Sequence, residues 1–179
     1  MSKYIWILPV LFMFHDMEEI VGAEKWVRGN LDAIITAHPG AERILNVYRN
    51  VTTTGFAAAV YEELIILLLI CIAAEFTDIT FFAGLWFGAL VAFTLHLIIH
   101  IIQAALIRRY IPSLITSVIC LPSGFILISK CVPLLTFDAM LIIGTILGII
   151  GVAVNLKFAH QIMLHISGSA QHTTFTRIG

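Results

Sequence analysis

Residues 79–107 read ITFFAGLWFGALVAFTLHLIIHIIQAALI, a stretch without a single aspartate, glutamate, lysine or arginine. Wound into an α-helix, it would extend about 43 Å, which exceeds the hydrocarbon core of a bilayer at about 30 Å. The whole chain of 179 residues shares this character, because 60% of its residues are hydrophobic and only 12% are charged. An ordinary soluble domain carries about 25% charged residues. The sequence therefore predicts an all-α, polytopic transmembrane helix bundle.

Four more apolar runs flank this stretch, so that about five spans are predicted, at residues 3–23, 52–74, 79–107, 113–130 and 137–166. The segment 24–50 mixes charged with apolar residues and is interrupted at His38-Pro39-Gly40. This pattern is typical of short amphipathic helices that lie on a membrane surface. We expect residues 1–179 to form a single transmembrane helical domain.

Lysines and arginines predict the orientation of the bundle, since cytoplasmic loops of membrane proteins carry an excess of positive charge. One side of the predicted bundle has only Lys3 and Lys130. The other side collects Lys25, Arg28, Arg43, Arg49, Arg108, Arg109 and Arg177. We therefore expect a multi-pass protein of the inner or plasma membrane with its N-terminus outside and its C-terminus in the cytoplasm. The net charge of -1, without a basic stripe, argues against a nucleic-acid partner.

Ionisable side chains inside the predicted spans are the candidates for function, because each costs on the order of 2.5–3.5 kcal/mol to insert. The first span ends with His15, Glu18 and Glu19. Their spacing of three and four residues places them on one face of a helix. The third span carries His96 and His100 one turn apart, and two histidines with this spacing can clamp a metal ion.

The second and fifth spans add further polar groups. Glu62 and Glu63 lie well inside an apolar run, and only one of these neighbours is expected to face the centre, because adjacent residues of a helix point about 100° apart. Asn155 and His160 lie in the fifth span, and Gln103 continues the histidine stripe of the third. At a rise of 1.5 Å per residue, the polar groups of the four spans lie roughly 6 to 16 Å from the cytoplasmic ends of their helices. This shared depth predicts one site near the cytoplasmic face.

Three features together resemble the HXXEE-domain family of small bacterial integral membrane proteins. They are the sequence HDMEE at 15–19, the glutamates of the second span, and the His-x-x-x-His third span that leads into RYIP at 109–112. The likeness extends from the first span to at least Thr116. Because that family has no established activity, the resemblance implies a helical membrane fold and a site rather than a reaction. The site residues that it implies are His15, Glu18, Glu19, His96 and His100, with Glu62 or Glu63.

Imidazole and carboxylate ligands suit Zn²⁺ or iron, so we expect a divalent metal as cofactor. Our hypothesis is a metal-dependent hydrolase that acts on an amphiphilic small molecule, such as a lipid, or on a membrane peptide. One glutamate would complete the ligand set, and another would act as general base on water activated by the ion. The predicted general bases are Glu18 and Glu19. The predicted ligands are His15, His96, His100, Glu62 and Glu63, with His160, Asn155 and Gln103 as additional candidates.

Other functions fit the same residues. A di-iron oxidative enzyme would use similar ligands, a carrier would relay protons or cations through them, and a structural subunit would use them only to hold helices together. The outer halves of the spans are nearly free of polar groups, which favours a one-sided pocket over a transport path. The pairs Gly84/Gly88 and Gly144/Gly148 have the spacing that lets helices approach closely in lipid, and the sequence leaves oligomerisation open.

Overall fold

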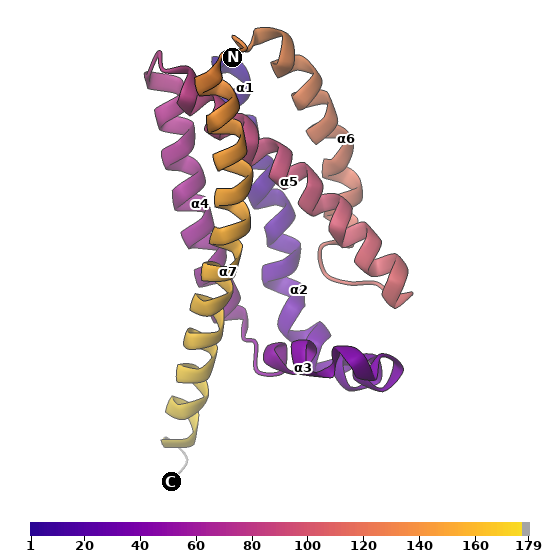
Figure 1. Ribbon diagram of the computed structural model, residues 1–179. Coiled ribbons are helices and arrows are strands. Elements are labelled where there is room, and N and C mark those ends of the chain that lie inside the picture. The colour runs from indigo at the N-terminus through magenta and orange to yellow at the C-terminus, as the bar shows by residue number, and fades with distance from the viewer. Residues whose placement is uncertain (177–179) are drawn as a thin grey trace.

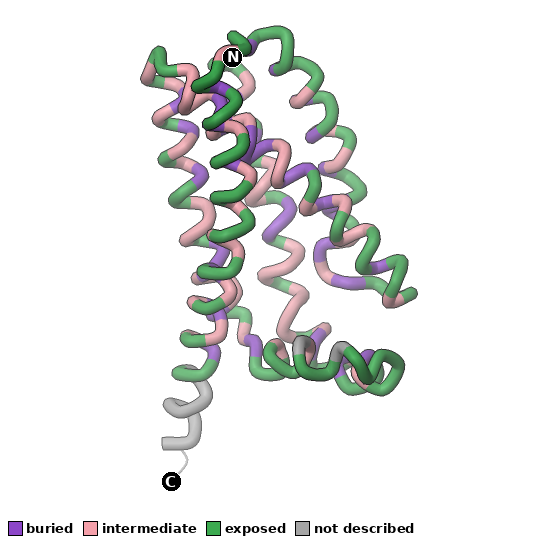
Figure 2. Tube along the Cα trace, viewed as in Figure 1, coloured by how far each residue is buried: buried purple, intermediate pink, exposed green. Residues whose placement is uncertain are grey.

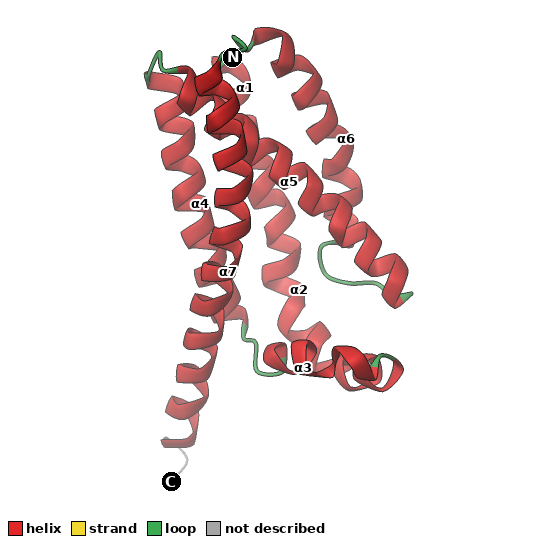
Figure 3. Cartoon of the chain, viewed as in Figure 1, coloured by secondary structure: helices red, strands yellow, loops and turns green. Residues whose placement is uncertain are grey.

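The computed structural model describes residues 1–176, and every regular element in this part of the chain is a helix (Figure 3). The expected all-α architecture is therefore confirmed. The α-helices are α1 (Ser2–Ile5), α2 (Ile7–Ala37), α3 (Glu42–Leu45), α4 (Thr53–Phe76), α5 (Thr80–Ile107), α6 (Leu114–Cys131) and α7 (Ala139–Thr176). Single 3-10 turns lie at Pro39–Ala41, Asn46–Tyr48 and Val132–Leu134.

Within the described residues, 4 helices are long and apolar enough to cross a membrane. They occupy Thr53–Phe76, Thr80–Ile107, Leu114–Leu134 and Ala139–Ser169. These ranges overlap the second to the fifth of the predicted spans. Residue 1 and the C-terminal end of α7 lie at opposite ends of the bundle (Figure 1). The first predicted span, which falls in α1 and α2, is not among these 4 helices. Arg177, which entered the orientation argument, lies outside the described residues.

The helix α2 is longer than the first span expected from the sequence. It includes residues 24–37, which were expected to belong to separate short helices, and it ends at Ala37. The reason is that no proline occurs between Pro9 and Pro39, so nothing in this interval removes a helical hydrogen bond. The expected break at His38-Pro39-Gly40 is present, and the connection to α4 crosses one end of the bundle (Figure 1).

Large apolar side chains cover much of the outer surface. Leu69 on α4, Ile126 on α6 and Val154 on α7 are 60%, 59% and 61% exposed, and exposed positions recur along α6 and α7 (Figure 2). A soluble monomer rarely exposes large contiguous apolar patches. Such a surface is instead the one that lipid tails solvate, in agreement with the membrane character of these helices.

A kink near the N-terminus creates a buried carbonyl that the bundle must satisfy. Pro9 has no N–H, so the carbonyl oxygen of Ile5 lacks the donor that a continuous helix would provide four residues later. The indole Nε1 of Trp86 on α5 lies 3.2 Å from this oxygen and donates to it. This contact ties the start of α2 to α5 deep in the core, where both Ile5 and Trp86 are fully buried.

Glycines bring α5 and α7 into very close contact. A methyl group at Gly88 would collide with the carbonyl oxygen of Thr145, and one at Gly148 would collide with the carbonyl oxygen of Leu85. Gly84 and Gly144 meet the opposite backbone in the same way. The predicted small-residue packing is therefore the contact that joins these two helices.

We predict that Gly88→Ala destabilises the protein by about 1–3 kcal/mol, because the added methyl group must push two backbones apart. Thermal unfolding of the purified protein in detergent would measure this as a lower midpoint. Gly29→Ala is the control, since nothing lies within 4 Å of a methyl group at Gly29. Equal midpoints for wild type and Gly88→Ala would show that the two helices are not packed as described.

Candidate metal centre

Two helices bring four potential ligands together. His15 and Glu19 come from α2, and His96 and His100 come from α5. One ligand atom from each of these side chains lies within 4.8 Å of the others, and the four residues are hereafter called the His/Glu group. The Nε2 atoms of His96 and His100 are 2.8 Å apart, and Nε2 of His100 is 3.1 Å from Oε1 of Glu19.

The spacing of the ligands explains why each helix can contribute two of them. His15 and Glu19 are four residues apart, as are His96 and His100, so each pair occupies one helical face. Where α2 and α5 pass each other, the two faces meet. The ring of His15 lies with its centroid 5.6 Å from that of His96 and 5.3 Å from that of His100. The predicted union of the first and third spans is thus present in the structure.

A chain of hydrogen bonds determines which nitrogen of His15 is free. The hydroxyl of Thr116 lies 2.7 Å from Oε2 of Glu18 and 3.1 Å from Nδ1 of His15. A hydroxyl has one proton, and a carboxylate is its stronger acceptor, so the hydroxyl donates to Glu18 and accepts from Nδ1 of His15. Nε2 of His15 then carries a lone pair. This atom is buried and has no hydrogen-bond partner among residues 1–176, as a vacant metal ligand would.

His100 is oriented in the same manner. Its Nδ1 lies 3.1 Å from Oε1 of Gln103, an amide oxygen that can only accept. Nδ1 therefore donates, and Nε2 is left to face Glu19 and His96. A second hydrogen bond of this type fixes the tautomer and the ring orientation of histidines that bind metals. Gln103, an additional ligand candidate in the sequence, thus lies where it can position His100.

Glu18 lies outside the His/Glu group, at the N-terminus of α6. Its carboxylate accepts hydrogen bonds from the backbone N–H and the hydroxyl of Thr116, at 2.8 and 2.7 Å, and from the hydroxyl of Tyr110 at 2.5 Å. Burial, together with this bond to Glu18, raises the pKa of Tyr110 to about 12, so its hydroxyl remains a donor. A carboxylate at a helix N-terminus satisfies free N–H groups and the helix dipole. The expectation that Glu18 is a general base finds no support in this position.

The remaining candidates lie around the group and contribute no atom to it. Glu63 lines the cavities beside His96, whereas Glu62 accepts a hydrogen bond from the amide of Asn155 at 3.2 Å. As expected, the two neighbouring glutamates have different surroundings. His160 packs edge-on against Tyr48, with 5.7 Å between the ring centroids.

Asp16 is a site residue that the sequence argument missed. Its side chain lines both cavities, the residue is only 4% exposed, and its Oδ2 has no hydrogen-bond partner in the described part of the chain. A signal was available, because Asp16 precedes Glu19 by three residues and therefore shares a face with it. A buried acidic atom without a partner, in cavities that His96 also lines, marks a polar position that a ligand or an ion can satisfy.

The donor set and its spread are compatible with one ion. Ligand atoms about 2.1 Å from an ion can be at most about 4.2 Å apart, so the present spread closes with small rotations of the side chains. Three imidazole nitrogens and one carboxylate oxygen suit Zn²⁺ or iron. Cys71, Cys120 and Cys131 are all buried and lie outside the His/Glu group.

The fold and this centre define a class of protein, namely a polytopic helical membrane protein with a partly buried His/Glu group that could hold a metal ion. The chain belongs to the family described as proteins of unknown function with an HXXEE motif, whose model matches residues 6–127. Searches of curated proteins and of solved structures gave no match. The matched range contains the complete His/Glu group, Glu18 and Thr116, whereas α7 lies beyond it.

We predict that Thr116→Val weakens metal binding by about 10–100-fold, the usual effect of removing a hydrogen bond to a ligating histidine. Without the hydroxyl, His15 loses the acceptor that fixes its tautomer. Competition with a chromogenic chelator would measure the affinity. Thr94→Val is the matched control, since the buried hydroxyl of Thr94 donates only to Leu90 of its own helix. The same affinity in Thr116→Val and wild type would exclude this role.

Proposed function

We propose that this protein binds Zn²⁺ or iron through His15, Glu19, His96 and His100 and hydrolyses a lipid-like or membrane-embedded substrate. The observation that carries the proposal is the convergence of four ligand atoms within 4.8 Å. The unpartnered Nε2 of His15 supports it, because a buried polar atom without a partner is costly. The lysine and arginine distribution supports a position of the group in the cytoplasmic half of the membrane, with the N-terminus outside.

A bound ion would supply Lewis acidity toward a substrate oxygen and would make a nearby water more acidic. The three histidines and Glu19 would hold the ion, and Thr116 and Gln103 would keep two of the imidazoles in the ligating tautomer. Glu63 and Asp16 remain as candidates for the general base, because both border the cavities next to His96. A base must lie within hydrogen-bond reach of the proton that it removes, and the carboxylate of Glu18 is already engaged by Tyr110 and Thr116.

The arrangement of polar groups supports an enzyme more than a carrier. Transport of protons or cations requires polar groups along a path to both faces. The cavity beside the His/Glu group instead has its polar residues at one end and continues among Leu8, Ile70 and Leu85. Such a one-sided pocket suits a substrate that enters, reacts and leaves on the same side.

A second candidate is an oxidative enzyme with two iron ions. Asp16 and Glu63 favour it, because they add carboxylates next to the His/Glu group, and carboxylate-rich sites of this kind in helical bundles hold di-iron centres. The metal content separates the two candidates, since the oxidative enzyme needs two iron ions per chain.

We predict near-stoichiometric zinc or iron in the purified protein, and a loss of most of it in His96→Ala and His100→Ala. Elemental analysis by mass spectrometry would measure the content after gel filtration in metal-free buffer. His38→Ala is the matched control, because this exposed histidine lies at the end of α2, away from the His/Glu group. A metal-free wild-type protein, prepared without chelators, would refute the proposal.

We further predict that Glu63→Gln retains the metal but loses turnover by about 10²–10⁴-fold, the usual contribution of a general base. A panel of fluorogenic acyl esters and amides would measure hydrolysis. Glu62→Gln is the matched control on the same helix, since Glu62 is paired with Asn155. Equal rates for Glu63→Gln and wild type would remove Glu63 from the reaction, and the same comparison with Asp16→Asn would then test the other carboxylate.

A further inference from the structure

Two cavities meet at the His/Glu group. The first has a volume of about 210 Å³ and lies between α2, α4, α5 and α7. The second, of about 390 Å³, also contains Glu19 and His100 and extends toward Tyr48 and Phe56, near the connection between α2 and α4. Asp16, Glu63 and His96 line both. The reactive groups thus lie at the junction of two spaces.

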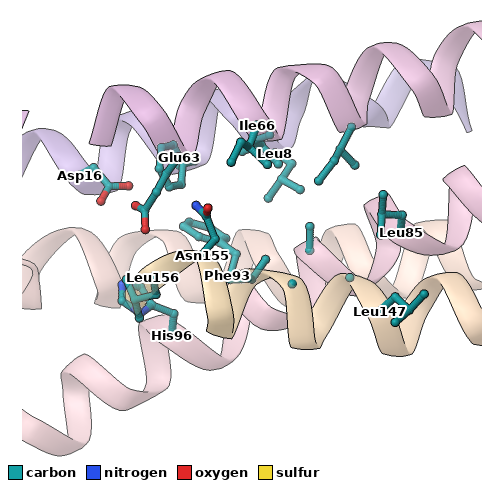
Figure 4. Close-up of a pocket in the computed structure, with 17 residues that line it drawn as sticks. Leu8, Asp16, Glu63, Ile66, Leu85, Phe93, His96, Leu147, Asn155 and Leu156 are labelled. Atoms are coloured by element: carbon teal, nitrogen blue, oxygen red, sulfur yellow. The ribbon is translucent and has the colours of Figure 1, made fainter. Parts of the chain in front are cut away.

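The first cavity is polar only where it meets the second. Figure 4 shows Asp16, Glu63 and Asn155 at one end, with Leu85 and Leu147 at the other. Leu8 and Asp16 are eight positions apart on α2, so the helix runs along the cavity for about 12 Å. A partly open apolar cavity with polar groups at one end matches a molecule that has a polar end and an apolar tail.

The volume and the lining of the first cavity determine which kind of apolar group it can hold. Its volume is below the roughly 300–1,000 Å³ of pockets for drug-sized ligands, so it admits one slender group rather than two chains side by side. A peptide segment would need partners for its N–H and C=O groups in a region without water. The walls beyond Asn155 are aliphatic or aromatic and offer none. A hydrocarbon tail needs none.

We propose that the first cavity holds the tail of a single-chain acyl amphiphile and that the polar head lies beside Glu19, His96 and His100, where the second cavity meets the first. The bond between acyl carbon and head group then lies beside the His/Glu group. Hydrolysis there adds the oxygen of water to the acyl carbon and breaks the bond from this carbon to the head group. The head group leaves with a proton, and a fatty acid remains. The reaction rests on the proposed function, whereas binding of the tail does not.

Photolabelling tests the binding directly. The probe is a non-hydrolysable alkyl ether amphiphile with one chain and a diazirine at the end of that chain, added to protein in phospholipid nanodiscs so that no detergent competes. We expect labelled peptides that contain Leu8 or Leu85, which line the cavity and are not exposed on the outer surface. Labelling confined to outward-facing positions such as Leu69 would overturn the proposal. Equal labelling of the cavity by a two-chain phospholipid analogue would overturn the single-chain class.

Gly151 offers a way to plug the cavity without disturbing the helix packing. It lines the first cavity, and nothing lies within 4 Å of a methyl group placed on it. Gly151→Phe should reduce labelling of the cavity at least tenfold, while Val154→Phe on the exposed face of the same helix should not. Thermal unfolding confirms that both variants fold. If Gly151→Phe is unfolded, the mapped positions in the wild type still decide the question.

The double variant His96→Ala/His100→Ala separates this inference from the metal hypothesis. Because the tail binds without the ion, we expect cavity labelling to persist in this variant. Cavity labelling together with a metal-free wild type would leave the tail site standing and remove the metal. A metal-loaded wild type that is labelled only on its outer surface would remove the tail site and leave metal binding standing.

Discussion

The core of a bilayer contains no water, so each polar group placed there must find its partner within the protein. This constraint explains contacts that are far apart in this chain. The carbonyl of Ile5, freed by Pro9, receives the indole N–H of Trp86. The free N–H groups at the start of α6 receive the carboxylate of Glu18. Where a buried atom is left without a partner, as at His15 Nε2, the exception marks a place for a ligand.

The side chains of the HXXEE motif contact two different helices that neighbour α2. His15 and Glu19 are one turn apart and face α5, whereas Glu18 points about 100° away from Glu19 and reaches α6. Thr116 links the two sides, because its hydroxyl joins the carboxylate of Glu18 to the imidazole of His15. Consecutive glutamates are therefore not redundant. One belongs to the His/Glu group, and the other fixes the helix whose threonine orients the histidine.

The sequence alone was sufficient to predict features that depend on a single segment of the chain. Spans follow from hydrophobicity within one segment, and the pairs His15/Glu19 and His96/His100 follow from helical spacing. It was insufficient where the answer depends on which helices are neighbours. The sequence placed Glu18 on one face with His15 and Glu19, whereas its carboxylate binds Thr116, 98 residues away in α6. Asp16 was missed for the same reason. That its Oδ2 is buried without a hydrogen-bond partner can be known only when the surrounding helices are known.

The packing of α7 connects the fold to the cavity. Gly144 and Gly148 lie directly against the backbone of α5, but one turn further Gly151 has nothing within 4 Å of its missing side chain. Asn155, another turn along, lies among the polar residues. Along this face of α7, the close backbone contact at Gly148 is followed by open space at Gly151 and then by the polar side chain of Asn155. Because the glycine contact holds α5 in place, it fixes His96 and His100 at the level where the space opens, so the tightest packing of the bundle positions its most polar site.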